Sequence, residues 1–322
     1  MKRKNPLFTG AEKTMNDTKK KELVEKILEL KKERDMAILA HYYVEGDLQE
    51  VADYIGDSFY LSKIGREIPN KNLIMCGVTF MGDTVKLLSP EKTVLYGHID
   101  ATCPMADMVT VEEIRKVKEE YDDLAVVCYV NSNMNVKAEC DVCVTSANAL
   151  KVVSELREKN IYFIPDGNLG GYIQEKLPEK NFILAKGYCP VHHFITPEGV
   201  EAAKKAHPNA PVLVHPECKK PVTDMADYAG STTGILDYIR DSEKKEFIVV
   251  TEEGIFHKAK ALRPDAVFYT AEKSQICDSM KLMNLENIYE TMRDMKPQVE
   301  LDKETSAKAV AALEKMLELA GK

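Results

Sequence analysis

The sequence predicts an α/β protein made of three homologous α/β/α layer-sandwich domains with parallel sheets, in a pseudo-threefold arrangement around a central active site. Three stretches begin with a short apolar run and end about 17 residues later in a small hydroxyl residue: AILAHYY…GDS, AVVCYVN…TSA and PVLVHPE…GST. A proline and then a cysteine recur after each stretch, at intervals of 86 or 88 residues. Short apolar runs also alternate with helical stretches of about 10–15 residues, which is typical of parallel strands joined by crossover helices. Together these patterns indicate one folding unit repeated three times.

Composition excludes several classes of protein. The chain has 322 residues, of which 44% are hydrophobic and 30% charged, so its core needs no disulfides for stability. No apolar run approaches the ~20 residues of a membrane span, and no secretory signal follows the basic N-terminus. We therefore expect a cytoplasmic protein without a membrane partner. The formal net charge of −8 also argues against nucleic acid as a partner.

The repeats divide the chain into a tail, three units and a C-terminal extension. We place the tail at 1–20, the units at 21–108, 109–195 and 196–284, and C-terminal helices that pack on the first unit at 285–322. Each unit begins with an amphipathic helix: one spans roughly 20–34, one follows the capping box Thr110-x-x-Glu113, and one follows Thr196 with a proline at its first position. Three strands follow in each unit. In chain order they read AILAHYY, NLIMCGV and KTVLYG, then AVVCYVN, NIYFIPD and NFILAK, then PVLVHPE, EFIVVTE and AVFYTA.

Polar residues cluster where the first strands end. Ligands of open parallel sheets bind beyond the carboxyl ends of the strands, so these residues predict the site. They are His41, Tyr42, Tyr43, Tyr129, Asn131, His215 and Glu217. A single histidine is more often structural than catalytic, but His41, His192 and His215 all fall at strand ends or beside a repeated cysteine. Tyr43 and Glu217 add groups that could transfer protons.

Three of the eight cysteines occupy equivalent places. Cys103, Cys189 and Cys277 each follow the third strand of a unit. Three thiolates at one point suit an iron-sulfur cluster, which four cysteines ordinarily hold, and would leave one iron open to act as a Lewis acid in a dehydration. Alternatively, each cysteine is a small buried apolar residue. The spacing alone leaves both interpretations open.

Hydroxyl-rich turns precede a helix in each unit. They contain Ser58, Ser146, Ser231 and Thr232. Such residues cap helices, and helix N-termini also bind carboxylate or phosphate. The two roles are compatible, and three such termini facing one cavity would suit a dicarboxylate together with a phosphate.

Two further interpretations come from other classes of protein. Cys140 and Cys143 form a C-x-x-C that a dithiol oxidoreductase or a zinc site could use, although no second pair exists and we favour a place in the sheet core. A non-enzymatic repeat module that binds a partner through its anion pocket is the second alternative. Neither a P-loop nor a complete Rossmann fingerprint occurs, so ATP and NAD cofactors are not indicated.

Long motifs in a fixed order extend from about residue 21 to 298. They include AHYY, VADYIGDS, CPMADM, CVTSANA, IPDGNLGGY, VHPEC, ADYAGSTTGI, VVTEEGIFHK and ICDSM. With these motifs the chain resembles the quinolinate synthase family, the iron-sulfur enzymes of NAD biosynthesis in bacteria and archaea. The resemblance implies a transferase that condenses iminoaspartate with dihydroxyacetone phosphate to quinolinate, phosphate and two waters, without redox change. It also implies that an aspartate-oxidising enzyme supplies the iminoaspartate.

The resemblance further implies the residues of the site. One 4Fe-4S cluster per chain would have Cys103, Cys189 and Cys277 as ligands, with the fourth iron acting on substrate as a Lewis acid. The implied substrate-binding and catalytic positions are His41, Tyr43, Ser58, Tyr129, Asn131, Ser146, His192, His215, Glu217, Ser231 and Thr232. Some members have C-x-x-C-x-x-C at the last ligand, whereas this chain has Ala271 and Ser274 before Cys277, which excludes a regulatory disulfide there. A related cluster-dependent dehydratase with another substrate is the nearest alternative, because fold and cluster alone do not select the acid.

Overall fold

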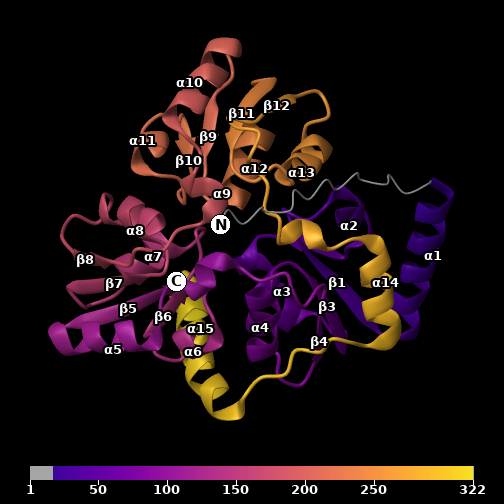
Figure 1. Ribbon diagram of the computed structural model, residues 1–322, viewed down its shortest axis with the longest axis horizontal. Coiled ribbons are helices and arrows are strands. Elements are labelled where there is room, and N and C mark those ends of the chain that lie inside the picture. The colour runs from indigo at the N-terminus through magenta and orange to yellow at the C-terminus, as the bar shows by residue number, and fades with distance from the viewer. Residues whose placement is uncertain (1–16, 322) are drawn as a thin grey trace, which may run out of the picture.

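Three four-stranded parallel sheets with one topology form the framework of the protein. The computed structural model describes residues 17–321, so most of the expected tail at 1–20 lies outside the described residues. The strand orders are β2-β1-β3-β4, β6-β5-β7-β8 and β10-β9-β11-β12, and every pairing is parallel. Figure 1 shows the three units around a common centre. The predicted fold class is confirmed.

The strands lie at these positions. In the first unit they are β1 (Met36–His41), β2 (Tyr54–Gly56), β3 (Asn72–Cys76) and β4 (Thr93–Tyr96). In the second they are β5 (Leu124–Tyr129), β6 (Val142–Val144), β7 (Asn160–Ile164) and β8 (Asn181–Leu184). In the third they are β9 (Val212–Val214), β10 (Tyr228–Ala229), β11 (Glu246–Val250) and β12 (Val267–Tyr269).

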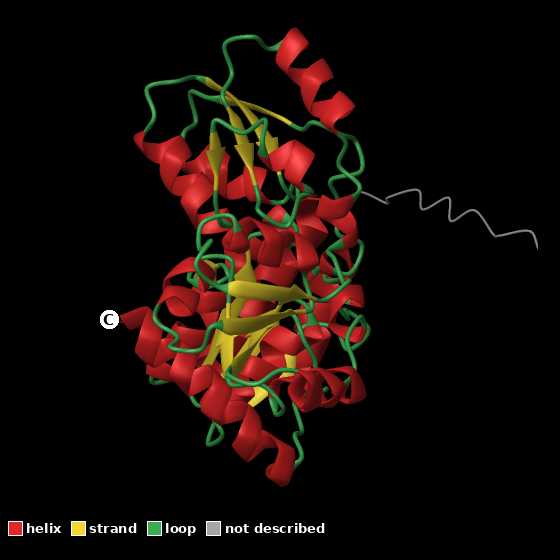
Figure 2. Cartoon of the chain, turned by 90° about the vertical axis from the view of Figure 1, so that its left-hand side faces the viewer, coloured by secondary structure: helices red, strands yellow, loops and turns green. Residues whose placement is uncertain are grey.

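Helices cover both faces of the sheets (Figure 2). The first unit has α1 (Asp17–Glu33), α2 (Gly46–Val51), α3 (Ser58–Glu67), α4 (Thr79–Leu88) and the 3₁₀ helix η1 (Pro104–Asp107). The second has α5 (Val111–Glu120), α6 (Met134–Lys137), α7 (Ala149–Ser154), α8 (Gly167–Gln174) and α9 (Pro190–His193). The third has α10 (Pro197–Ala206), α11 (Lys220–Thr223), α12 (Thr232–Asp241), α13 (Ile255–Leu262) and η2 (Met280–Leu282), and the chain ends with α14 (Leu285–Asp294) and α15 (Lys303–Gly321). None of the helices within 17–321 has both the length and the apolar character of a membrane span.

Local capping signals set the helix starts. The capping box before α5 is complete, since Thr110 accepts a hydrogen bond from the backbone of Glu113 and the Glu113 carboxylate accepts one from the backbone of Thr110. The hydroxyl turn at Thr145 and Ser146 behaves differently. The Thr145 N–H donates to Asn148 Oδ1 at 2.7 Å, and α7 begins only after Asn148, so this turn approaches the helix without capping it.

The sequence analysis predicted three strands in each unit and missed one short edge strand in each sheet, namely β2, β6 and β10. These edge strands have only two or three residues, too few to show a period, and an aspartate precedes each of them. One carboxylate oxygen of each aspartate accepts a hydrogen bond of 2.7–2.8 Å from the backbone of the unit's first strand. The pairs are Asp53 with Ile38, Asp141 with Val126 and Asp227 with Val212. A side-chain hydrogen bond therefore holds each edge strand where the ladder itself is short.

The core joins the first two units more closely than the third. Their buried side chains form one hydrophobic cluster, whereas the third unit is built around two others, one of which also includes Tyr42 of the first unit. Of the C-terminal helices, α14 packs on α1 and β4 of the first unit. The last helix, α15, contacts α4 of the first unit but also α6, β6 and α7 of the second (Figure 1), because its buried stripe around Leu313 belongs to the shared core. Both C-terminal helices thus contact the first unit, and α15 contacts the second unit as well.

Candidate functional site

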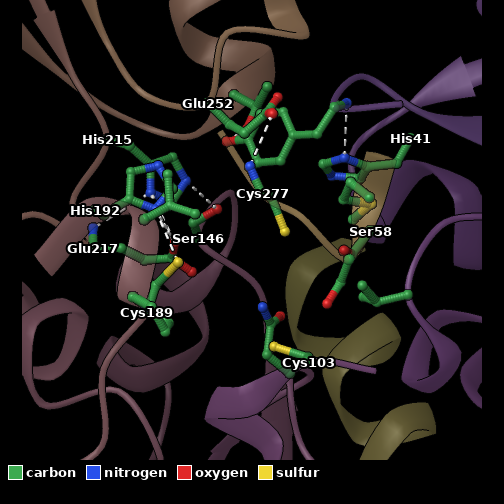
Figure 3. Close-up of a pocket in the computed structure, with 18 of the residues that line it drawn as sticks. His41, Ser58, Cys103, Ser146, Cys189, His192, His215, Glu217, Glu252 and Cys277 are labelled. Atoms are coloured by element: carbon green, nitrogen blue, oxygen red, sulfur yellow. Dashed lines mark hydrogen bonds and ion pairs between the residues drawn. The ribbon is translucent and has the colours of Figure 1, made fainter. Parts of the chain in front are cut away.

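A cavity of about 240 Å³ lies where the three units meet, beyond the carboxyl ends of their strands. Its wall includes Cys103, Cys189 and Cys277, each from a different unit. Figure 3 shows these thiols around the cavity, together with the histidines and carboxylates of the neighbouring strand ends. The repeat therefore brings its equivalent cysteines to one place, which the spacing alone left open.

Each of the three cysteines receives backbone hydrogen bonds from the turn that follows it. The donors to Cys103 Sγ are the N–H groups of Met105 and Ala106, and Cys189 and Cys277 have similar donors. Burial raises the pKa of the Cys103 thiol to about 12 and that of Cys277 to about 11. Without a metal the thiols are therefore protonated, and a metal would displace their protons while the N–H groups stabilise the thiolates.

A buried histidine–carboxylate contact lies in the wall. His192 Nδ1 lies 2.7 Å from Glu217 Oε2, and the two side chains are almost entirely buried. Burial by itself would raise the pKa of Glu217, but His192, His215 and a hydrogen bond from Tyr129 together lower it to about 2. Glu217 is therefore an ionised carboxylate at neutral pH, with His192 as its closest partner.

Two histidines repeat one local geometry in different units. The backbone N–H of Tyr43 donates to His41 Nδ1 at 3.1 Å, and the backbone N–H of Glu217 donates to His215 Nδ1 at 3.3 Å. Because Nδ1 accepts in both rings, the proton of each neutral imidazole is on Nε2. Burial lowers the pKa of each histidine to about 3, so both are neutral donors at neutral pH. His215 Nε2 lies 3.3 Å from Ser146 Oγ.

The two tyrosines of the site are buried phenols. Burial, with Glu217 nearby, raises the pKa of Tyr43 and of Tyr129 well above the usual value. Tyr129 donates to Glu217, while the Tyr43 hydroxyl lies 2.9 Å from Thr232 Oγ1. Both residues are therefore neutral hydrogen-bonding groups at neutral pH.

The structure places nearly all of the predicted residues on the cavity wall. The lining contains His41, Tyr43, Ser58, Cys103, Tyr129, Asn131, Ser146, Cys189, His192, His215, Glu217, Thr232 and Cys277. Two residues are exceptions. Tyr42 is buried in a hydrophobic cluster with side chains of the third unit, and the Ser231 hydroxyl caps α12 by accepting from the Gly234 N–H at 3.2 Å. Cys140 and Cys143 are not part of the wall; Cys143 lies in β6, paired with Cys128 of β5.

The sequence analysis missed several polar residues of the site. Thr251 and Glu252 follow β11, the middle strand of the third unit, and both are fully buried. The rule that selected His41 at the end of β1 would also have found Thr251 and Glu252, if it had been applied to the expected strand EFIVVTE, which is β11. Lys281 pairs with Glu252 at 3.1 Å, a contact that only the fold reveals. Thr145 also lines the cavity, and its buried hydroxyl has no partner among the described residues.

The donor atoms of the wall fit a bound metal. Cys189, His192 and Glu217 bring three potential ligand atoms within 4.8 Å of one another. The Nδ1 of His192 is already paired with Glu217, which makes the imidazole a proton donor on that side. The wall also holds three thiols, one from each unit, including that of Cys189. Thiolates are soft metal ligands and are the usual ligands of iron-sulfur clusters.

Fold and cavity together define an enzyme that uses a metal cofactor on small molecules. The family model described as "Quinolinate synthetase A protein" matches residues 25–318. Quinolinate synthase from Fusobacterium nucleatum is 52% identical over 297 residues, covering 92% of this chain and 99% of that protein. The proteins of that name from Clostridioides difficile and Caldicellulosiruptor bescii are 48% and 46% identical, each over at least 92% of this chain and 98% of the relative. The chain belongs to the quinolinate synthetase A protein family and is an enzyme of NAD biosynthesis.

Proposed function

We propose that this enzyme condenses iminoaspartate with dihydroxyacetone phosphate to give quinolinate, phosphate and two waters. The reaction is balanced without an oxidant or a reductant. The observation that carries the proposal is the convergence of three equivalent cysteines on one cavity that also holds an ionised carboxylate, neutral histidines and several hydroxyls. The family supports the choice of substrates.

We further propose that Cys103, Cys189 and Cys277 hold one 4Fe-4S cluster. The backbone donors at each thiol support this assignment, since they favour the thiolate form. Such a cluster would supply a Lewis acid, because one of its four irons would have no protein thiolate.

The side chains of the wall divide into binding and proton-transfer groups. Ser58, Asn131, Ser146 and Thr232 present hydroxyl and amide groups that suit carboxylate and phosphate oxygens. The neutral Nε2–H groups of His41 and His215 are further donors for these oxygens.

We assign proton transfer to fewer side chains than substrate binding. Glu217 with His192, and Tyr43, are the groups we assign to moving protons during the loss of water and phosphate. His41 and His215 can assist where the substrate reaches their Nε2 atoms. Iminoaspartate itself would come from an enzyme that oxidises aspartate.

The decisive experiment measures iron, sulfide and quinolinate formation for protein purified without oxygen. We expect about four irons per chain in the wild type, and loss of both cluster and activity in Cys103→Ala. Cys140→Ser is the matched control, since Cys140 is a partly buried cysteine outside the cavity wall, and should keep both. A colourless wild type that cannot be reconstituted would refute the cluster. An inactive Cys140→Ser with an intact cluster would instead favour a dithiol enzyme.

The proposed proton-transfer roles have a separate test. Tyr43→Phe and Glu217→Gln should keep the cluster but lose about 100-fold or more in kcat, because general acid-base groups typically contribute about 10²–10⁴. Wild-type kcat in both variants would show that protons move elsewhere.

A further inference from the structure

Three cysteines that the proposed function does not use lie together in the second unit. Cys128 of β5 and Cys143 of β6 are direct partners in the parallel ladder, so their side chains leave the sheet on the same face, with Cα atoms about 4.8 Å apart. Cys140 lies in the turn between α6 and β6, and both Cys140 and Cys143 form a side-chain hydrogen bond with Cys128. Cys128 is therefore the centre of a thiol triad, Cys128, Cys140 and Cys143, that lies outside the cavity wall.

A fully buried cation accompanies the thiol triad. The Nζ of Lys137, in α6, donates to the Ser132 carbonyl at 2.5 Å and lies 5.3 Å from the centre of the Phe80 ring. Among residues 17–321, Lys137 forms no ion pair with a carboxylate. Buried charges in proteins are ordinarily paired, and Cys128 is the group that can supply the anion here. Burial alone would raise the pKa of Cys128, but hydrogen bonds from the other two thiols and the charge of Lys137 together hold it well below its usual value.

The three thiols differ in their access to solvent. Cys128 and Cys143 are fully buried, whereas Cys140 is partly exposed and its Sγ lies 3.0 Å from the Val136 carbonyl oxygen. A reagent that arrives from solvent therefore meets Cys140 first. An exposed thiol in contact with a buried thiol whose anion is favoured is the arrangement that thiol–disulfide exchange requires, with one sulfur to attack and a second to resolve the mixed disulfide.

We propose that Cys140 and Cys128 form a site of reversible oxidation, at which a low-molecular-weight disulfide such as glutathione disulfide converts the two thiols into one protein disulfide. Cys140 gives its proton to the Cys128 sulfur and attacks one sulfur of glutathione disulfide. The S–S bond of the reagent breaks, and the departing glutathione thiolate takes the proton from Cys128. The Cys128 thiolate then attacks the Cys140 sulfur of the mixed disulfide, and the second glutathione leaves. Two cysteines are thereby oxidised, and one glutathione disulfide is reduced to two glutathione molecules.

The new bond closes a loop that carries part of the cavity wall. Tyr129 and Asn131 both line the central cavity, and both lie between Cys128 and Cys140 in the chain. Cys128 directly precedes Tyr129 at the end of β5. The oxidation site is therefore adjacent to the cavity but uses none of the three proposed cluster ligands. The inference goes beyond the proposed function and does not depend on it.

Peptide mapping after oxidation tests the proposed disulfide. Trypsin cleaves after Lys137, so Cys128 falls in peptide 119–137, and Cys140 and Cys143 fall in peptide 138–151. Enzyme purified without oxygen is incubated with glutathione disulfide, alkylated, digested and analysed by mass spectrometry. We expect the two peptides to be joined by a disulfide that dithiothreitol breaks. A bond confined to peptide 138–151, or no protein disulfide at all, would overturn the proposal.

Serine variants assign the role of each thiol. Cys140→Ser should abolish the link between the two peptides, because no exposed sulfur remains to attack. Cys128→Ser should leave Cys140 as a stable mixed disulfide with glutathione, because nothing resolves it. Cys143→Ser is the matched control and should keep the link, since neither step uses Cys143. A link that persists in Cys140→Ser, or one that is lost in Cys143→Ser, would overturn the assignment.

Lys137→Met tests the buried cation. Methionine keeps the length of the side chain but removes the charge, so the two peptides should become joined about tenfold more slowly. Lys92→Met removes another buried lysine, whose Nζ donates to the Gly65 carbonyl at 2.7 Å in the first unit, and should leave this rate unchanged. A wild-type rate in Lys137→Met would overturn the role of the cation. If Lys137→Met does not fold, the serine variants still decide the disulfide.

The test also separates failure of this inference from failure of the proposed function. Joined peptides are identified by their masses, whether or not the enzyme holds a cluster or forms quinolinate. A wild type without quinolinate formation would refute the function and leave the disulfide to be read as before. A wild type that forms quinolinate but no link between the two peptides would overturn the oxidation site alone.

Discussion

Replacing Glu252 by alanine should remove the carboxylate that fixes the loop of Cys277. Glu252 Oε1 accepts from the Cys277 backbone N–H at 3.2 Å and pairs with Lys281 Nζ at 3.1 Å, while Oε2 accepts from the Gly254 N–H at 2.7 Å. Lys281 also donates to the Tyr43 carbonyl at 2.8 Å. One buried carboxylate, through Lys281, thus connects a proposed cluster ligand to the backbone of Tyr43 in the first unit. Gly254 is required in this arrangement, because a Cβ there would lie 2.7 Å from the Tyr43 carbonyl oxygen.

The size of the effect follows from what the substitution leaves behind. Two backbone N–H groups lose their acceptor, at about 1–3 kcal/mol each, and breaking a buried pair costs about 3–5 kcal/mol. These contributions overlap, since they share one carboxylate, and we expect a loss of about 3–5 kcal/mol in the free energy of unfolding. At about 2 °C per kcal/mol for a chain of this size, the unfolding midpoint of Glu252→Ala should fall by roughly 6–10 °C.

Thermal unfolding of the metal-free chain, followed by circular dichroism, measures this shift, and iron retention after reconstitution reports on the Cys277 loop. Glu201→Ala is the matched control, because Glu201 forms an exposed pair with Lys205 at 3.9 Å and should change the midpoint by less than about 2 °C. A Glu252→Ala midpoint indistinguishable from the control, with wild-type iron retention, would refute the reasoning.

Three further predictions concern stability. His41 and His215 have a pKa of about 3 in the folded chain against a usual value of 6.5. Between about pH 3 and pH 6.5 the unfolded chain therefore binds more protons than the folded chain. Acidification from about pH 6.5 should accordingly lower the free energy of unfolding by up to about 1.4 kcal/mol per histidine and pH unit. Urea unfolding at pH 7 and pH 5 measures this, and His215→Asn should reduce the slope; a flat profile in the wild type would contradict it. Thr110→Ala removes the hydroxyl that caps α5 and should cost about 0.5–2 kcal/mol in urea unfolding, so an unchanged midpoint would show that the cap is dispensable. Leu313→Ala should cost about 2–5 kcal/mol, because this fully buried side chain of α15 lies in the core that the first two units share, and calorimetry would disprove the prediction if the loss stayed below 1 kcal/mol.

The sequence by itself determined the repeated unit and most of the site. Capping signals such as Thr110 with Glu113 act within one turn of helix, and the strand-end positions of His41 and His215 follow from a parallel sheet, so both are visible in a linear pattern. The spacing of the three cysteines likewise follows from the repeat. These features depend on local backbone geometry or on periodicity, which the chain encodes directly.

Only the tertiary structure decided how the units combine. The contact of Tyr43 with His192 through Thr251 joins three units, and its bonds of 2.7 and 2.8 Å depend on the relative placement of three sheets. The short edge strands could not be predicted from the sequence, because two or three residues show no periodicity. The packing of α15 on two units could not be predicted either, because an amphipathic helix shows which face is buried but not which element covers that face. The sequence specifies which groups point toward the strand ends, but hydrogen bonds between units form only within tenths of an ångström, and packing of the assembled core sets that distance.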